Sequence, residues 1–110
     1  EQQRFYQAMQ HFKKAKQLAS QTDNNDLKAL IKYNMGDLLS IQGLYREALE
    51  QYKDVANLYT AYPKKQVKCY STIGRMFLLL DQQDSTLLYF QKGLEIAKKT
   101  ENKELYSLIT

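Results

Sequence analysis

Apolar residues recur every three or four positions along almost the whole chain, which is the period of a helix that buries one face. The first stripe predicts a helix over residues 2–20 and consists of Phe5, Ala8, Phe12, Ala15 and Ala19. Comparable stripes predict helices over residues 26–41, from 45 to the turn at Pro63, over 64–80 and over 85–99. Residues 104–110 are typical of a sixth helix that has only begun. No alternating strand pattern competes, so the predicted fold class is all-α.

Short polar segments separate these stripes and predict the turns between helices. Asn25 or Asp26 is expected to cap the second helix at its N-terminus, and Asp84 is expected to cap the fifth. Gly43 stands where a glycine cap would end the second helix. The segment TENK, residues 100–103, is expected to form the last turn. Because these connections are short, consecutive helices should run antiparallel.

One side-chain pattern occurs three times at long, nearly constant spacing. A small residue, an aromatic residue four positions on and another small residue three positions later make up Ala8–Phe12–Ala15, Ala48–Tyr52–Val55 and Thr86–Phe90–Gly93. The interval from one copy to the next is about 40 residues, which is typical of a helical repeat. Gly36 and Gly74 are separated by the same interval as the second and third copies. Such a period predicts a stack of similar units rather than one globular core.

These residues resemble the tetratricopeptide repeat family. Met35–Gly36 and Ile73–Gly74 match the apolar–glycine pair on the first helix of the family's hairpin, and the small–aromatic–small series matches its second helix. The resemblance implies antiparallel helical hairpins stacked in a right-handed superhelix. It also implies that small residues let two helix backbones approach, while the aromatic residue fills the wedge between one hairpin and the next.

The chain departs from the family pattern at two points. The family's unit is usually roughly 34 residues long, whereas the intervals in this chain are longer and similar to those of bacterial regulators and sensor proteins. An early aromatic residue of the first helix is present as Tyr70 but is replaced by Lys32. The resemblance divides the chain into the second helix of a truncated unit (1–25), two complete units (26–63 and 64–101) and the start of a further first helix (102–110). Apolar residues near both ends lead us to expect a piece of a longer array.

In this family the first helices of the hairpins line a concave groove that takes peptides or extended segments. Carried over residue by residue, the groove positions on one helix are Leu30, Tyr33, Asn34, Asp37 and Ser40. On the next such helix they are Lys68, Ser71, Thr72, Arg75 and Leu79. The amide of Asn34 can donate and accept at once, which suits a peptide bond. Arg75 can bind a carboxylate of a ligand or form a salt bridge with Asp37, and the sequence leaves these alternatives open.

Composition argues against catalysis. His11 is the only histidine and Cys69 the only cysteine, so the chain has no internal disulfide and no zinc-type ligand spacing. The four glycines do not cluster into a phosphate loop. We therefore expect no enzyme activity, no cofactor and no metal. The net charge is +4, but most lysine groups fall near helix ends or on polar faces, which disfavours nucleic acid as the partner.

The sequence thus predicts a non-catalytic module that binds a protein or peptide through its first-helix faces. The long repeats suggest a bacterial signalling or transcription-regulatory parent protein. Self-association through exposed repeat ends is the alternative, and an RNA-binding helical repeat is a third and less favoured one. No apolar run approaches the ~20 residues of a membrane helix, and the compartment stays open, with the cytoplasm favoured over an extracytoplasmic sensor.

Overall fold

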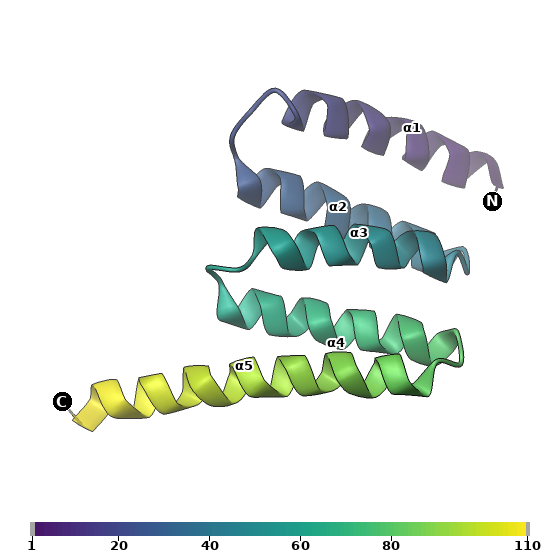
Figure 1. Ribbon diagram of the computed structural model, residues 1–110. Helices are drawn as coiled ribbons and strands as arrows, with labels where there is room; N and C mark the ends of the chain where they lie inside the picture. Colours follow the sequence, from purple (N-terminus) through teal and green to yellow (C-terminus); the bar gives the residue numbers. More distant parts are fainter. Residues whose placement is uncertain (1, 110) are drawn as a thin grey trace.

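The computed structural model describes the backbone of residues 2–109 and the side chains of residues 2–101 and 103. Five helices follow one another: α1 (Gln2–Ala19), α2 (Asn25–Ile41), α3 (Tyr45–Leu58), α4 (Pro63–Leu79) and α5 (Gln83–Ile109). Figure 1 shows them stacked in chain order, each antiparallel to the next. The stack is flat, with extents of 55 × 37 × 17 Å. The expected all-α fold of antiparallel hairpins is confirmed, and no strand occurs between residues 2 and 109.

The ends of the helices agree with the sequence pattern in most places, with two corrections. The N-cap of α2 is Asn24 rather than Asn25 or Asp26, and its side chain accepts a hydrogen bond from the Leu27 amide at 3.1 Å. Asp84 does not cap α5, because the helix already begins at Gln83 and Asp84 lies in its first turn. There its negative charge still favours the helix dipole. Pro63 occupies the first turn of α4, where its missing N–H costs nothing.

Two helices, α2 and α4, end in the same capping motif. Gly43 has a φ of +79°, and the amides of Gly43 and Leu44 bond back to the carbonyls of Ser40 and Leu39. This is a Schellman motif with glycine at its left-handed position, as the sequence predicts. Asp81 occupies the same position after α4, with a φ of 59° and the equivalent backbone bonds. Asp81 is therefore explained by the turn, although a side chain there is strained.

The fifth helix is longer than the sequence pattern predicts. The expected turn at residues 100–103 is wrong, because α5 continues without a break to Ile109. Proline ends the helical stretch before α4, but the residue that corresponds to Pro63 in the next unit is Glu101, which does not interrupt a helix. Thr100 lies within the helix, and its hydroxyl donates a hydrogen bond to the Ile96 carbonyl at 2.9 Å. Residues 102–109 thus continue α5 instead of opening a separate sixth helix; residue 110 lies outside the described residues.

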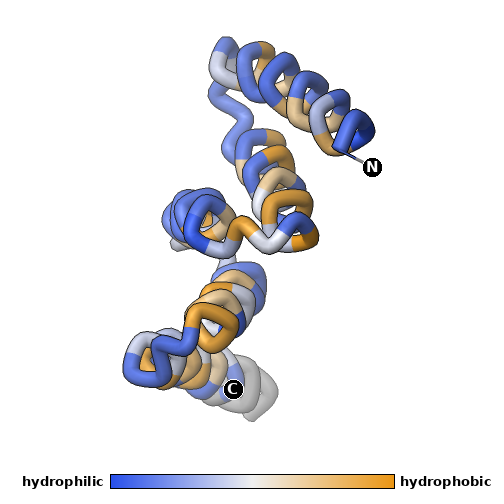
Figure 2. Tube along the Cα trace, turned by 90° about the vertical axis from the view of Figure 1, so that its right-hand side faces the viewer, coloured by the Kyte–Doolittle hydropathy of each residue, from blue (hydrophilic) through white to orange (hydrophobic). Residues whose placement is uncertain are grey.

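The core lies between the helices and is built from the positions that the period selects. Its buried apolar residues include Ala29, Met35, Ala48, Leu49, Tyr52, Val55, Ala56, Cys69, Ile73 and Met76. In Figure 2 the apolar positions recur along every helix of the stack, alternating with polar ones. Helix α1 contributes less, since Ala19 is its only buried residue and Phe5, Met9 and Phe12 are partly buried.

A ring packed on a glycine joins the two helices of each complete hairpin. A Cβ added to Gly36 of α2 would lie 2.6 Å from Cε1 of Tyr52 of α3, which is closer than atoms can approach. Gly74 of α4 meets the ring of Phe90 of α5 in the same way. The expectation that the aromatic residue fills the wedge between hairpins is therefore corrected. Its ring fills the space over the glycine inside its own hairpin.

The first prediction concerns this contact. Gly36→Ala should lower the free energy of unfolding by about 1–3 kcal/mol, because the added methyl overlaps a buried ring that has no room to move. The measurement is urea unfolding followed by circular dichroism. Gly93→Ala is the matched control, since its added Cβ would meet its nearest neighbour, Cβ of Tyr70, at 3.6 Å. That variant should be neutral or more stable by up to ~1 kcal/mol. Equal stability of both variants would contradict the ring-on-glycine account.

The second prediction concerns the strained turn. Asp81→Gly should raise the free energy of unfolding by about 1 kcal/mol, because glycine adopts positive φ without the steric cost that a Cβ carries. Gly43→Asp places the opposite change at the equivalent turn and should lower stability by a similar amount. Thermal and urea melts of the two variants test this, and an Asp81→Gly protein no more stable than the parent would exclude strain at Asp81.

Candidate protein-interaction surface

The ten predicted groove residues lie on α2 and α4, and the structure separates them by exposure. Leu30 and Leu79 are 54% and 55% exposed, although large apolar residues usually avoid water. Asn34, Asp37, Lys68, Ser71 and Arg75 are also exposed, whereas Tyr33 and Ser40 are half-buried. Thr72 is 4% exposed and therefore cannot offer much surface to a ligand. We call the exposed members, with Tyr33, the α2/α4 face.

Tyr33 ties the two helices of this face together. Its hydroxyl lies 3.1 Å from the Thr72 hydroxyl, which in turn donates to the Lys68 carbonyl at 3.0 Å. The ammonium group of Lys68 lies 5.5 Å from the centre of the Tyr33 ring, within the range of a cation–π interaction. Thr72 is thus a buried partner that holds the Tyr33 hydroxyl in place. Its bond with Tyr33 joins two separate units and fixes the spacing between α2 and α4.

Asp37 is anchored by the same tyrosine that packs on Gly36. The Tyr52 hydroxyl donates a hydrogen bond of 2.6 Å to Oδ1 of Asp37. The Tyr52 ring also meets the Tyr33 ring edge-on, with 5.2 Å between the ring centres. Burial raises the pKa of Tyr52 far above its ordinary value, and the carboxylate of Asp37 raises it further. Tyr52 therefore stays a neutral donor, and one oxygen of Asp37 is held in place while the residue remains exposed.

Arg75 does not form the salt bridge with Asp37 that was one alternative. Within the described side chains, the ion pair that forms joins Lys32 and Asp54, at 2.9 Å, and Arg75 is not part of one. The positive charge of Arg75 lowers the pKa of Tyr52 and so opposes the larger effects of burial and of Asp37. Arg75 is thus exposed and is not paired to the anchored carboxylate.

Ser71 also belongs to a second feature of the surface. It lines a pocket of about 300 Å³ between α4 and α5, together with Val67, Phe90, Gly93, Leu94 and Ala97. The α2/α4 face is narrower than the sequence predicts, because Thr72 is buried and Ser40 is half-buried. Its exposed members are the polar residues Asn34, Asp37, Lys68, Ser71 and Arg75 and the leucines Leu30 and Leu79.

The reactive side chains of the chain have structural explanations. Cys69 is buried, and burial raises the pKa of its thiol to about 11, against a smaller lowering by Lys68. The thiol is therefore protonated at neutral pH and is not a nucleophile. His11 is exposed on α1. Among the described residues no group of three or more histidine, cysteine and acidic side chains is arranged to hold a metal ion, and none of the helices is long and apolar enough to cross a bilayer.

Sequence reasoning missed the polar contacts that hold this surface. The Tyr52–Asp37 bond and the Lys32–Asp54 pair each join two different helices, so neither follows from helical spacing. One signal was visible: Lys32 stands at the position that Tyr70 occupies in the next unit. A charged residue at the position of an aromatic one needs a polar partner, and Asp54 provides it.

Comparison with known proteins agrees with this architecture. The family model described as tetratricopeptide repeat matches residues 1–61 and again residues 29–99. The Tonsoku-like protein of Drosophila melanogaster is 29% identical over 92 residues, which cover 82% of this chain and 6% of that protein. The chain thus spans a small part of the length of this relative. No solved structure gives a significant match. Because the family model covers nearly the whole helical stack, the chain belongs to the tetratricopeptide repeat family.

Proposed function

We propose that the chain binds an extended peptide segment of a protein partner across the α2/α4 face. Tetratricopeptide repeats generally mediate protein–protein interaction, and the family assignment supports this class of function. The observation that carries the proposal is the exposure of Asn34, Asp37 and Arg75 on helices joined by the Tyr33 and Tyr52 contacts. Among the described side chains, neither Asp37 nor Arg75 has an ion-pair partner. A surface held in one geometry loses little entropy when it binds.

The chemistry of the face suits a peptide that carries an acidic group and an apolar side chain. Asn34 offers one acceptor and two donors to a peptide bond. Arg75 offers a planar fork that matches a carboxylate. The exposed leucines, Leu30 and Leu79, offer apolar surface. These three kinds of contact together fix the direction and position of an extended segment.

The setting of this module is part of the same proposal. The repeat interval of about 40 residues, longer than the family's usual unit, is the support for a bacterial signalling or transcription-regulatory parent protein. The division into units at residues 1–25, 26–63 and 64–101 is proposed with it, and its support is the ring-on-glycine contact found once in each complete unit. Absence of any output domain in the full open reading frame would count against this setting.

The third prediction tests the face. Peptides selected from a random display library for binding to the chain should lose affinity about threefold to tenfold on Asn34→Ala, and at least tenfold on Arg75→Ala, as expected for lost neutral and charged hydrogen bonds. Isothermal calorimetry measures the affinities, and circular dichroism confirms folding. Asn57→Ala and Arg46→Ala, two exposed positions on α3, are the matched controls. Unchanged binding in both face variants would refute the assignment.

One observation favours a second function, self-association through α5. Leu49 and Ala56 of α3 are 5% and 2% exposed, but their counterparts in the next unit, Leu87 and Leu94, are 61% and 56% exposed. Phe90, the counterpart of Tyr52, is likewise exposed. In α3 this stripe is covered by α4. In α5 the same stripe is open and can bury apolar area against another copy.

The fourth prediction separates this function from peptide binding. Leu94→Glu should convert any concentration-dependent oligomer into a monomer in sedimentation velocity, because a carboxylate resists burial in the stripe. Leu88→Glu is the control, since its counterpart in α3, Glu50, is already an exposed charge. A parent chain that is monomeric at all concentrations would exclude self-association and leave peptide binding untouched.

A further inference from the structure

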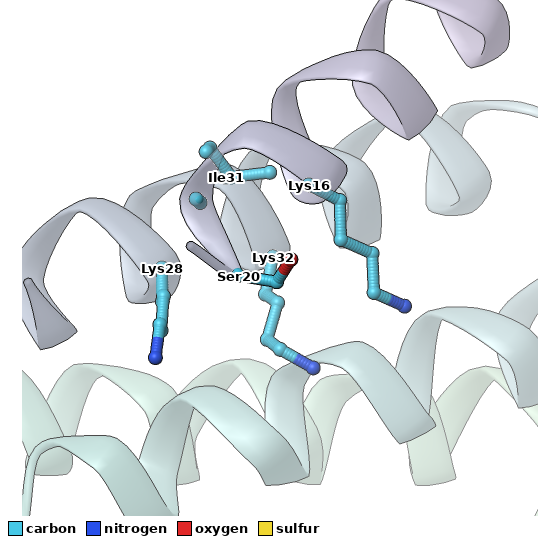
Figure 3. Close-up of a pocket in the computed structure, with 6 residues that line it drawn as sticks. Lys16, Ser20, Lys28, Ile31 and Lys32 are labelled. Carbon is cyan, nitrogen blue, oxygen red and sulfur yellow. The ribbon is translucent and has the colours of Figure 1, made fainter. Parts of the chain in front are cut away.

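A pocket between α1 and α2 stands apart from the α2/α4 face. It has a volume of about 220 Å³ and is lined by Lys16, Ala19, Ser20, Lys28, Ile31 and Lys32. Figure 3 shows the three lysine side chains extending in the same direction, with Lys32 between the other two. The pocket therefore combines an apolar floor, made by Ala19, Ile31 and the lysine methylene chains, with a rim of positive charge.

The internal repeat explains why this pocket is open. Along α2 and α4 the repeated glycines set the register, and Lys32 then corresponds to Tyr70. Along α1 and α3 the repeated aromatic residues set the register, and Ala19 then corresponds to Tyr59. Tyr59 is partly buried at the junction of α3 and α4, where its ring meets the Tyr62 ring and the ammonium group of Lys65. Tyr70 instead contacts Tyr89 of α5. The junction of α1 and α2 has Ala19 in place of the Tyr59 ring, and the missing volume is left as the pocket.

The two hairpins also differ in the charged residues at corresponding positions. Tyr70 packs against Tyr89 and lies 6.0 Å beneath the ammonium group of Lys92. In the earlier hairpin the pair is replaced by Lys32 and Asp54, which form the 2.9 Å ion pair. Gln66 bonds the Ala56 carbonyl at the α3–α4 junction, whereas its counterpart Lys28 makes no such bond. The α1–α2 junction thus has a lysine and an open space where the α3–α4 junction has a glutamine and a tyrosine ring.

Two of the three lysines can contact a negatively charged ligand. Lys32 is neutralised by Asp54, but Lys16 and Lys28 have no ion-pair partner among the described residues. An occupant must therefore bring negative charge to the rim and apolar surface to the floor. A cavity of ~150 Å³ holds benzene, and drug-sized ligands use roughly 300–1,000 Å³. The pocket is accordingly sized for a single leucine or phenylalanine side chain.

We propose that the α1–α2 pocket binds an acidic peptide that inserts one apolar side chain between α1 and α2 and places flanking carboxylates on Lys16 and Lys28. This site is separate from the proposed α2/α4 face, and its occupant is defined by two features together. The lysine rim attracts the carboxylates, and the floor selects the apolar side chain. Neither an acidic peptide without an apolar side chain nor an apolar peptide without carboxylates satisfies the whole site.

The experiment uses fluorescence anisotropy with a fluorescein-labelled peptide of sequence Glu-Asp-Glu-Leu-Asp-Glu. Two matched probes replace its leucine with alanine, or its acids with the corresponding amides. The parent chain should bind the first probe at least tenfold more tightly than either matched probe, since burying a leucine and forming two charged contacts each contribute about a factor of ten. Added salt should weaken the first probe's binding, because the rim contacts are exposed.

Three variants locate the binding. Lys16→Gln with Lys28→Gln should weaken the first probe about tenfold. Ala19→Tyr introduces the ring that Tyr59 carries at the junction of α3 and α4, fills the pocket and should abolish the preference for leucine over alanine. Lys13→Gln, an exposed lysine of α1 outside the pocket, is the control for general charge and should leave the affinity unchanged. Circular dichroism and urea unfolding establish that each variant is folded.

Several results would overturn the proposal. Equal affinity for the leucine and alanine probes would show that the pocket takes no side chain. Unchanged binding in Lys16→Gln with Lys28→Gln, or an equal loss in Lys13→Gln, would reduce the effect to net charge. Tighter binding of poly(uridylic acid) than of the peptide, lost in the same double variant, would make the site a nucleic-acid contact. The variants of the α2/α4 face test a separate proposal, because their affinities are measured with different peptides.

Discussion

The stack depends on one kind of contact, an aromatic ring lying directly on a glycine of the preceding helix. Tyr52 on Gly36 and Phe90 on Gly74 bring the two helices of each complete hairpin closer than any larger residue would allow. The close approach buries the small residues around it, including Ala48 and Val55. Because interiors are packed to nearly crystalline density, a hairpin built this way has a defined geometry. The contact occurs once in each complete unit, and the hairpins recur with it.

The same ring connects the core to the candidate surface. Tyr52 is 1% exposed, yet its hydroxyl reaches Asp37 at the edge of the α2/α4 face, and its ring meets Tyr33. Tyr33 then reaches Thr72 on the next first helix. A buried polar group must find a partner, so the tyrosine hydroxyls order the polar residues around them. The face is therefore positioned by the core rather than by its own exposed side chains.

Differences between the hairpins matter as much as their likeness. Where the junction of α3 and α4 has Tyr59, the junction of α1 and α2 has Ala19, and a pocket with three lysines in its lining results. Where α3 is covered by α4, the matching stripe of α5 is exposed. Gly43 and Asp81 both have positive φ at the equivalent turn, but only glycine adopts positive φ without strain. These departures leave a basic pocket between α1 and α2, exposed apolar side chains on α5 and a strained turn at Asp81.

The sequence by itself determined the helices, their antiparallel order and the repeat, because apolar periodicity and turn residues act over three to four positions. It identified Gly36, Tyr52 and their counterparts as equivalent, but it placed the rings between hairpins instead of within them. It also placed a turn at residues 100–103, where weak local signals did not outweigh the propagation of α5. Only the tertiary structure decided that Thr72 is buried, that Arg75 lies free of Asp37 and that Lys16, Lys28 and Lys32 share a pocket. Such contacts join residues on different helices, and the distance between two helices depends on the volume of every side chain packed between them.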